Sequence, residues 1–448
     1  MFPQLRKIEQ KYGDQVVIVG VHSPKFPAER ETSNLREAVR RYRIEHPVVN
    51  DRDFEIWHRF GGRAWPTLMF VDPEGRVIGK HEGELPFEQF DPLVAGMLSE
   101  FEARGLLDHS PSRVDLTQVS EPDGVLRFPG KVVVANSLLY IADTNHHRIL
   151  VAKQDGSITT SIGSGRPGLV DGDSQQAQFQ QPQGMAFEGS TLYVADTENH
   201  AIRAVDLESG AVKTLAGTGL QALQPATGPG PAAATPLSSP WDLAIDGQSL
   251  YVAMAGTHQI WSLDLERGIV APFAGTGREG LLDGAVAEAW FAQPSGLTLA
   301  RGKLYVADSE VSAIREVELA SGSVRTLVGE DLFVFGDQDG EGEVVRLQHP
   351  MGITAGNGAL YVADSYNNKI KRLDPETRRV TTWLGSGVAG DGEGTGPAAS
   401  LREPGGLCAA DSGLFIADTN NHRIVFADWK TGWLRTVIEA GGRGGVQK

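Results

Sequence analysis

The chain has 448 residues, of which 40% are hydrophobic, and it carries a formal net charge of −16. This composition allows a sizeable core, while the acidic balance argues against nucleic acid as a partner, because phosphate binding needs a basic surface. No apolar run approaches the roughly 18 residues that a membrane span needs, and the single cysteine, Cys408, excludes an internal disulfide or a cysteine-based metal cluster.

The first residues, MFPQLRKIEQ, are charged and lack the apolar region of a signal peptide, which predicts a cytoplasmic protein. Apolar residues at helical spacing predict that the chain starts in an amphipathic helix. The elements predicted next are a strand at 16–21, a helix at 34–43, a strand at 47–50, a short helix at 54–60, a strand at 67–71 and its hairpin partner at 76–82. A last helix is predicted with Asp91 as N-cap and Pro92 at its first helical position, running to about Arg104.

This order of elements, with Arg63-Ala64-Trp65-Pro66-Thr67 before an apolar strand, resembles the thioredoxin fold. The resemblance implies that Pro66, after Trp65, is the cis-proline that sits against the active-site cysteines in that family. A plain turn proline is the alternative, since only about 5% of X-Pro bonds are cis in folded proteins.

The resemblance also implies a Cys-x-x-Cys motif at the start of the first long helix, and the chain already begins at that helix. We therefore expect residues 1–107 to form an incomplete, N-terminally truncated thioredoxin-like domain. It would lack its first strand and its cysteine pair, and it would have no dithiol oxidoreductase activity. Turn-rich stretches around Asp108–Ser112 and Glu121–Gly124 predict a linker at 108–127.

The rest of the chain is organised around one segment that occurs six times. It reads LYIADTNHHRI from Leu139 and returns from Leu192, Leu250, Leu304, Leu360 and Leu414. The spacings are 53, 58, 54, 56 and 54 residues, and a fixed period of this kind indicates a repeat architecture.

Each copy lies in a longer pattern of four short apolar runs separated by turn residues, which predicts four strands. Such units cannot bury both faces alone, so radial stacking of six predicts a six-bladed β-propeller over 128–440, with every blade contiguous in sequence. A proline precedes each copy, and a glycine usually follows it by two residues. Lys131 and Asp242 replace that glycine in repeats 1 and 3.

The signature Leu-Tyr-Val-Ala-Asp-Ser/Thr-x-Asn-x-x-Ile resembles the NHL repeat. A thioredoxin-like domain followed by such a propeller is similar to the NHL repeat-containing protein 2 family. The fold class implied is a thioredoxin-like α/β domain plus an all-β, six-bladed propeller. The function implied is a scaffold that binds a protein or peptide through one propeller face, linked to redox homeostasis in a longer form.

The aligned copies place four histidines in one register, which could hold zinc if they met at the axis; they are His147, His200, His258 and His422. We expect instead a structural role, because these residues follow the repeat symmetry and lie in the turn before the third strand. Five aspartates share another register, with Met254 as the exception, and are expected to accept backbone N–H bonds; they are Asp143, Asp196, Asp308, Asp364 and Asp418.

No metal and no cofactor are predicted. Asp337–Gly342 resembles a calcium loop only faintly, since Gln348 stands where the bidentate glutamate would be. Cys408 aligns with small strand residues and is expected to be a packed, inert thiol.

Trp241, which follows Pro240 where other repeats have small or polar residues, is a candidate for a binding face near the channel mouth. Arg148 and Arg423 are the other candidates for that face. The competing hypothesis is an enzyme. It would be a thiol–disulfide oxidoreductase if a longer form carries Cys-x-x-Cys, or a metal-dependent propeller lyase that uses the histidine set.

Overall fold

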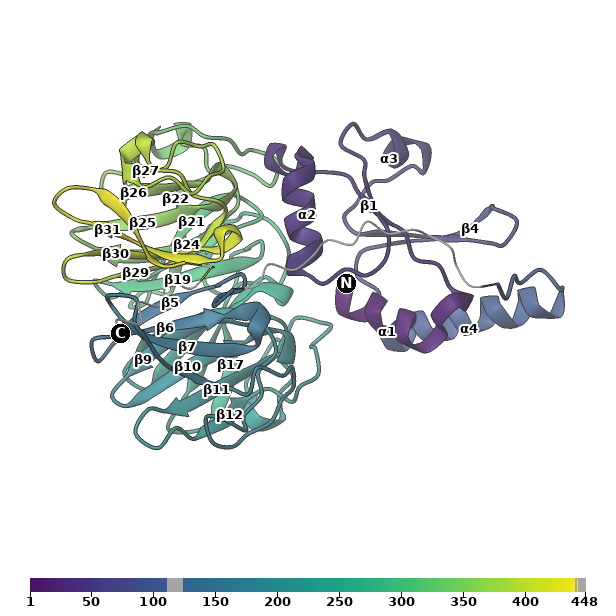
Figure 1. The fold of residues 1–448 in the computed structure, drawn as a ribbon, viewed down its shortest axis with the longest axis horizontal. Helices are drawn as coiled ribbons and strands as arrows, with labels where there is room; N and C mark the ends of the chain where they lie inside the picture. Colours follow the sequence, from purple (N-terminus) through teal and green to yellow (C-terminus); the bar gives the residue numbers. More distant parts are fainter. Residues whose placement is uncertain (111–123, 440, 442–448) are drawn as a thin grey trace. The chain divides into compact units, whose positions relative to one another are not determined.

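The structure, a computed structural model, describes residues 1–110, 124–439 and 441. The chain divides into two compact units between Glu121 and Pro122 (Figure 1). Residues 111–123 of the predicted linker lie outside the described residues. Within the described ranges, no helix is long and apolar enough to cross a membrane.

The first unit is a thioredoxin-like α/β domain whose elements follow the predicted order. They are α1 (Phe2–Tyr12), β1 (Gly20–His22), α2 (Thr32–Arg41), β2 (Val48–Asn50), α3 (Glu55–Arg59), β3 (Thr67–Val71), β4 (Val77–Glu82) and α4 (Phe87–Ala103). β1 pairs in parallel with β2, and β3 pairs antiparallel with β4, as two separate two-stranded sheets.

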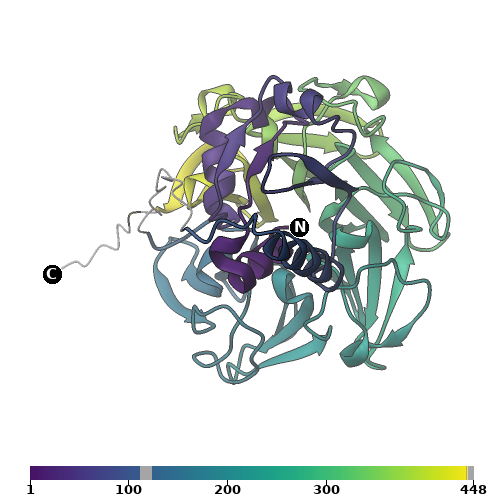
Figure 2. The ribbon, with the colours of Figure 1, turned by 90° about the vertical axis from the view of Figure 1, so that its right-hand side faces the viewer.

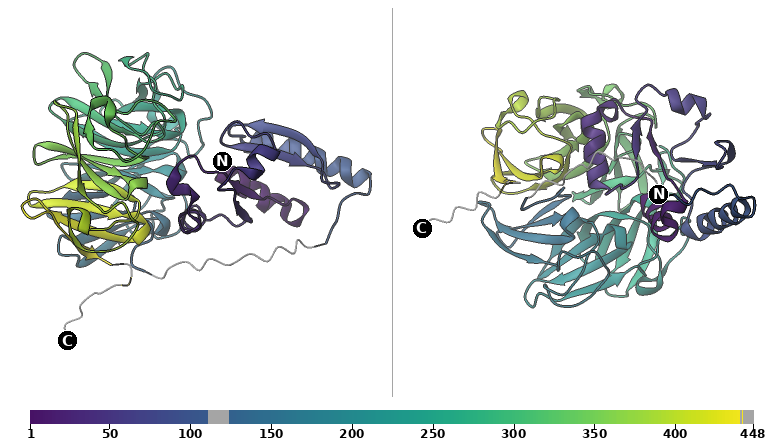
Figure 3. Two further views of the ribbon diagram at one scale, coloured as in Figure 1. Left: turned by 90° about the horizontal axis from the view of Figure 1, so that it is seen from above. Right: turned by 45° about the vertical axis from the view of Figure 1, so that its right-hand side comes forward.

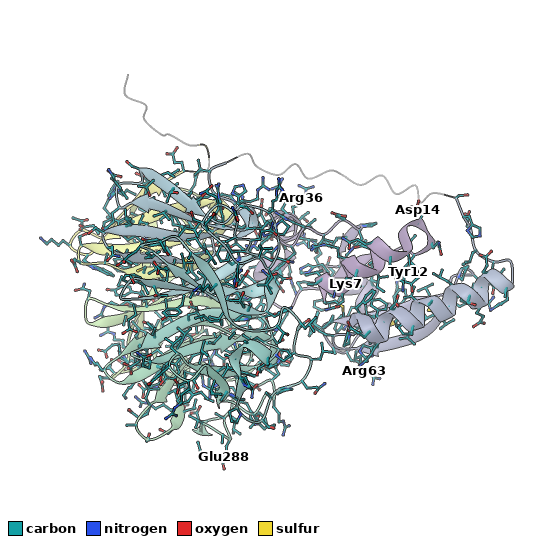
Figure 4. The ribbon with its side chains drawn as sticks, turned by 90° about the horizontal axis from the view of Figure 1, so that it is seen from below. Lys7, Tyr12, Asp14, Arg36, Arg63 and Glu288 are labelled. Carbon is teal, nitrogen blue, oxygen red and sulfur yellow. The ribbon has the colours of Figure 1, made fainter. Side chains whose placement is uncertain are left out.

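The core of this unit lies where α1 and α4 pack against the strands. Leu5 and Ile8 of α1 and Phe90 and Val94 of α4 are buried in one cluster. Figure 4 shows Tyr12 at the end of α1, close to α4. Its hydroxyl donates to Asp91 Oδ1 at 2.6 Å, and this bond fixes the two helices against each other.

Two predicted boundaries in this unit were wrong. The strand expected at 16–21 is paired only from Gly20, because its partner β2 is three residues long. The last helix begins at Phe87, ahead of Pro92, because Pro86 takes the N-cap position while Asp91 binds Lys11 and Tyr12 instead of capping. Pro92 removes only one backbone bond, that to the carbonyl of the exposed Glu88.

The second unit is a six-bladed β-propeller, and each blade is one contiguous stretch of the described chain, as predicted. The strands of blades 1 to 3 are β5 (Val132–Ala135), β6 (Leu138–Asp143), β7 (Arg148–Lys153) and β8 (Ile158–Ile162); β9 (Pro182–Glu188), β10 (Thr191–Asp196), β11 (Ala201–Asp206) and β12 (Val212–Ala216); β14 (Pro240–Asp246), β15 (Ser249–Met254), β16 (Gln259–Asp264) and β17 (Ile269–Ala274). Those of blades 4 to 6 are β19 (Pro294–Ala300), β20 (Lys303–Asp308), β21 (Ala313–Glu318) and β22 (Ser323–Val328); β24 (Pro350–Gly356), β25 (Ala359–Asp364), β26 (Lys369–Asp374) and β27 (Arg379–Leu384); β29 (Pro404–Ala409), β30 (Gly413–Asp418), β31 (Arg423–Asp428) and β32 (Trp433–Ile438).

A short fifth strand at the outer edge of four blades was not predicted. It comes from the loop that enters the blade and pairs with the fourth strand; these strands are β13 (Gly230–Pro231), β18 (Gly284–Ala285), β23 (Gly340–Glu341) and β28 (Gly394–Thr395). Each is two residues long, too short to leave a periodic signal in the sequence. The added strand pairs with two residues of the fourth strand and so covers part of an otherwise open sheet edge.

The six sheets stand around one axis, with the first strand of each blade innermost (Figure 2). The inner strands contact one another in the order β5, β9, β14, β19, β24 and β29, and β29 returns to β5. Figure 3 shows the last blade, in yellow, beside the first, in blue. The repeated Leu-Tyr-Val-Ala residues form the hydrophobic clusters between neighbouring blades. This explains why all six copies have apolar residues there, with Ile for Val in the first copy and Phe-Ile for Tyr-Val in the sixth.

Candidate functional site

The inner strands approach one another most closely at the position that is glycine in four of the six repeats. A Cβ atom at Gly184 would overlap Cα of Asp242 in the next blade, and one at Gly352 would overlap the carbonyl oxygen of Gly405. These glycines are therefore required by backbone contact between blades, close to the axis.

The two repeats that lack this glycine carry opposite charges, and the structure pairs them. Lys131 Nζ lies 3.2 Å from Asp242 Oδ2 and donates to the carbonyl oxygens of Ser295 (3.0 Å) and Met351 (2.7 Å). The two charged side chains are only 6% and 9% exposed. Burial raises the pKa of the Asp242 carboxyl, and the Lys131 ammonium opposes that rise. The sequence reveals both departures from glycine, but sequence reasoning assigned them no role.

Trp241 directly precedes Asp242 in β14 and is partly exposed. The pairing of β14 with β15 shifts between Pro240 and Asp242, so Trp241 occupies a β-bulge, an irregularity that re-aims a side chain. It is the largest side chain in its repeat position; the equivalent residues are Gly130, Gln183, Ser295, Met351 and Gly405.

The four aligned histidines join neighbouring blades. Each ends a single 3₁₀ turn in the left-handed region, with φ between 49° and 55°. Each Nδ1 accepts a backbone N–H bond from the residue that precedes the proline of the next repeat; the donors are Gln181, Ser239, Gln293 and Phe128, at 3.0–3.1 Å. Ser312 and Asn368 accept the same bond through side-chain oxygens in the other two blades. The histidine register is thus a repeated connection between blades.

The aligned aspartates connect the turns within each blade. All five are fully buried, and each Oδ1 accepts a backbone N–H bond at 2.7–2.8 Å from the residue sixteen positions earlier. Burial raises the pKa of Asp196 to about 6, although Arg203 Nη1 donates to its Oδ2 at 2.8 Å. The pKa of Asp364 rises further, to about 7, because its cation, Lys371, is 4.0 Å away.

Arg148 and Arg423, which the sequence suggested for a binding face, bond to these aspartates. Arg148 Nε donates to Asp143 Oδ2 at 2.8 Å, and Arg423 Nε donates to Asp418 Oδ2 at 2.7 Å. Arg423 as a whole is only 6% exposed. Three residues were suggested for a binding face near the channel mouth. Arg148 and Arg423 form ion pairs with buried aspartates, and Trp241 does not.

No group of three or more His, Cys, Asp or Glu side chains suited to hold a metal occurs in the described part of the chain. The histidine set, spread over four blades, is therefore not brought together. In the calcium-like loop, Lys371 Nζ binds Asp337 Oδ1 (2.6 Å) and Asp339 Oδ1 (2.8 Å). The ammonium group thus stands where a metal cation would have to bind.

Cys408 lies on β29, where its sulfur accepts the backbone N–H of Val134 from the first blade at 3.3 Å. Burial raises the pKa of the thiol to about 11, so the reactive thiolate is scarce at neutral pH. This contact also connects the last blade to the first.

In the α/β unit, the Trp65–Pro66 peptide bond is cis and immediately precedes β3. The Trp65 indole stacks on Trp57 with ring centroids 4.5 Å apart, and its Nε1 donates to the carbonyl oxygen of Ser23 at 2.8 Å. Ser23 Oγ in turn donates to the buried Asp51 carboxylate at 2.8 Å. Backbone N–H groups at the start of α3 lower the pKa of Asp51 against the effect of burial. Trp65 remains 45% exposed beside the proline.

Fold and site together define a six-bladed propeller joined to a thioredoxin-like unit. No family model matches the chain. It is 43% identical to NHL repeat-containing protein 2 of Bos taurus, over 96% of this chain and 64% of that protein. It is 42% identical to the protein SUPPRESSOR OF QUENCHING 1, chloroplastic, of Arabidopsis thaliana, over 96% of this chain and 43% of that protein. The chain belongs to the family of NHL repeat-containing protein 2.

The chain spans 64% of the length of the bovine relative. A shorter alignment, 24% identical, covers 22% of this chain and 68% of the thiol-disulfide oxidoreductase YkuV of Bacillus subtilis (strain 168). The cytoplasmic location stays a prediction.

Proposed function

We propose that the propeller is a protein- or peptide-binding scaffold whose recognition surface surrounds the axis at Trp241. The observation that carries this proposal is the partly exposed indole on a β-bulge, at a position where the other blades have smaller side chains. Aromatic side chains of this kind are the residues that most often dominate the energy of a protein interface. Nucleic acid is not part of the proposal, because residues 113–448 carry 26 basic and 39 acidic residues.

The test is to select binding peptides from a displayed library with the 448-residue chain. Peptides that bind the parent should lose at least about tenfold in affinity on Trp241→Ala, a loss typical of an interface hot spot. Trp433→Ala is the matched control, because Trp433 is a 49%-exposed tryptophan on the outer strand β32. Equal binding by parent and Trp241→Ala would refute the proposed surface.

A second candidate function is thiol–disulfide exchange by a protein that contains this chain together with a reactive cysteine pair. Two observations favour it: the exposed Trp65 beside Pro66, and the similarity to a protein named as a thiol-disulfide oxidoreductase. The proposed link to redox homeostasis is part of this second candidate function.

The chain itself holds one thiol, that of Cys408, with a pKa raised to about 11. Exchange needs an accessible thiolate and a resolving partner, so we expect the 448-residue chain not to reduce insulin disulfides. A turbidity assay with a dithiol reductase as positive control measures this. Reduction by the parent that disappears in Cys408→Ala would contradict the expectation.

A further inference from the structure

We propose that Lys131 is an axial pin, a side chain that crosses the propeller axis, binds three blades on the far side and closes the axis at that level. This inference is independent of the proposed binding surface. It concerns the two repeat positions at which Lys131 and Asp242 replace the glycine of the other four repeats.

The order of the inner strands fixes the direction in which the Lys131 side chain runs. Lys131 directly precedes β5, and the ring order places β19 opposite β5. Its ammonium group reaches the backbone of Ser295 on β19, that of Met351 on β24 and the carboxylate of Asp242 on β14. Since none of these strands is a ring neighbour of β5, the aliphatic stem must pass over the axis.

The chemistry of the site matches an ammonium group. A lysine has three N–H donors, and three oxygen atoms surround Nζ at 2.7–3.2 Å. The carboxylate of Asp242 is held in turn by the backbone N–H groups of Leu243 and Leu297, both at 2.9 Å. A buried charge is tolerated when it is paired and fully hydrogen-bonded, and both charges here meet that condition.

At both charged positions the backbone of the neighbouring inner strand lies in close contact with the charged residue's own backbone. A Cβ atom at Gly406 would overlap Cα of Lys131, as one at Gly184 would overlap Cα of Asp242. The glycines of the other repeats therefore let the inner strands close around a single crossing side chain. Ligands are consequently confined to the two ends of the propeller.

Chemical rescue tests the pin. Lys131→Gly, which introduces the residue of the other four repeats, removes a butylammonium side chain and leaves its oxygen cradle. We expect a lower Tm for this variant. Added n-butylammonium chloride should raise that Tm in a saturable manner, because a ligand that binds only the folded state stabilises it. Tetramethylammonium chloride at equal concentration, which has no N–H donor, should not.

Three controls make the test specific. Neither salt should raise the Tm of the parent or of Lys213→Ala, which alters an exposed lysine. Lys131→Gly combined with Asp242→Asn should lose the rescue. An unchanged Tm in Lys131→Gly, or equal effects of the two salts on it, would overturn the proposal.

Should Lys131→Gly not fold, Lys131→Met keeps the length of the side chain without its charge. Hydrogen exchange of the Leu297 amide should then be about tenfold faster or more, because its acceptor Asp242 has lost its cation, while the Leu192 amide in β10 is unchanged. Unchanged exchange at Leu297 would overturn the pin.

Discussion

The histidine that precedes the third strand in four of the six blades contributes one acceptor nitrogen. In four blades Nδ1 accepts a backbone N–H bond from the next blade, and in the fifth Asn368 Oδ1 does the same at 2.9 Å. An imidazole nitrogen that accepts is unprotonated. The position requires a hydrogen-bond acceptor and not histidine itself, because Ser312 and Asn368 accept the same bond in the other two blades.

We predict that His200→Asn leaves the free energy of unfolding within about 0.5 kcal/mol of the parent, as for a substitution that keeps the same contacts. Asparagine tolerates the left-handed backbone at φ 49° and supplies the acceptor oxygen. His200→Gly fits the same backbone but leaves the Ser239 N–H without its acceptor, which should cost about 1 kcal/mol. Urea denaturation measures both variants, and equal stability of the two would refute the bond's contribution.

A second prediction concerns the pH dependence of the buried Asp364. Its pKa of about 7 in the folded chain lies above the ordinary aspartate value of 3.8, so the folded state holds this proton more tightly than the unfolded state. Its contribution to stability is therefore present below pH 3.8 and is lost as pH rises through 7. Asp364→Asn removes the titration, so the stability of the parent minus that of the variant should fall between pH 4 and 7.

The fall should be at most about 1.4 kcal/mol per pH unit. Urea denaturation of parent and variant at pH 5 and 7.5 measures it. Asp206→Asn is the control, because Asp206 lies on the surface and its pKa is lowered rather than raised. A difference that stays constant or rises with pH for Asp364→Asn would contradict the assignment.

At the scale of the element, blade 3 shows that the buried aspartate of a blade and the cation that pairs with it are replaced together. Blades 1 and 6 neutralise the aspartate with Arg148 or Arg423 at the start of the third strand. Blades 2, 4 and 5 use a cation two residues further on; these are Arg203, Arg315 and Lys371. Blade 3 has Met254 for the aspartate and the buried Trp261 for the cation, and so buries neither charge.

We predict that Met254→Asp alone lowers the free energy of unfolding by about 3 kcal/mol or more, because it buries a carboxylate without a cation. Adding Trp261→Arg, the residue type of blades 2 and 4, should recover part of the loss. A coupling energy of about 1–3 kcal/mol is the range for residues that share one ion pair. The two single variants and the double variant form a thermodynamic cycle, and additive losses would show that the two positions do not act as a pair.

The sequence repeat made the blades of the propeller predictable, but it did not predict the side-chain contacts at the propeller axis. The Leu-Tyr-Val-Ala segment marks the second strand of a blade and occurs six times with small variations, so the number of blades and the order of their strands follow from the sequence. The two-residue outer strands, such as Gly284–Ala285, have no period of their own. The contact of Lys131 with Ser295 and Met351 joins residues more than 160 positions apart through backbone atoms, which leave no mark on residue identity. In the α/β unit, Pro92 indicated a helix start that the capping position of Pro86 overrides.

At the scale of the whole molecule, the two units differ in whether their sheets have packing partners on both sides. The propeller closes on itself: Thr419 Oγ1 donates to the carbonyl oxygen of Pro129 at 2.8 Å, and His422 accepts from Phe128 at 3.0 Å. Every inner strand thus has a neighbour on both sides. The described α/β unit instead has two separate two-stranded sheets, and Val17, Val19 and Val21 expose their side chains.

We therefore predict that the α/β unit exchanges its backbone amides faster than the propeller. The small core between its strands and helices α1 and α4 buries fewer apolar side chains than the cluster between two blades, so it offsets less of the cost of ordering the chain. Amides of β1 and β3 should open by local unfolding at least about tenfold more often than those of β10 or β25, whose alternate side chains are buried between blades. Hydrogen exchange of the full chain, followed by mass spectrometry of its proteolytic fragments, measures both units in one sample. Cys408→Ala should leave the ratio of the two rates unchanged, since the sulfur lies in the propeller. Protection of β1 and β3 equal to that of the inner blades would mean that the α/β unit gains stability from contacts beyond its own two sheets.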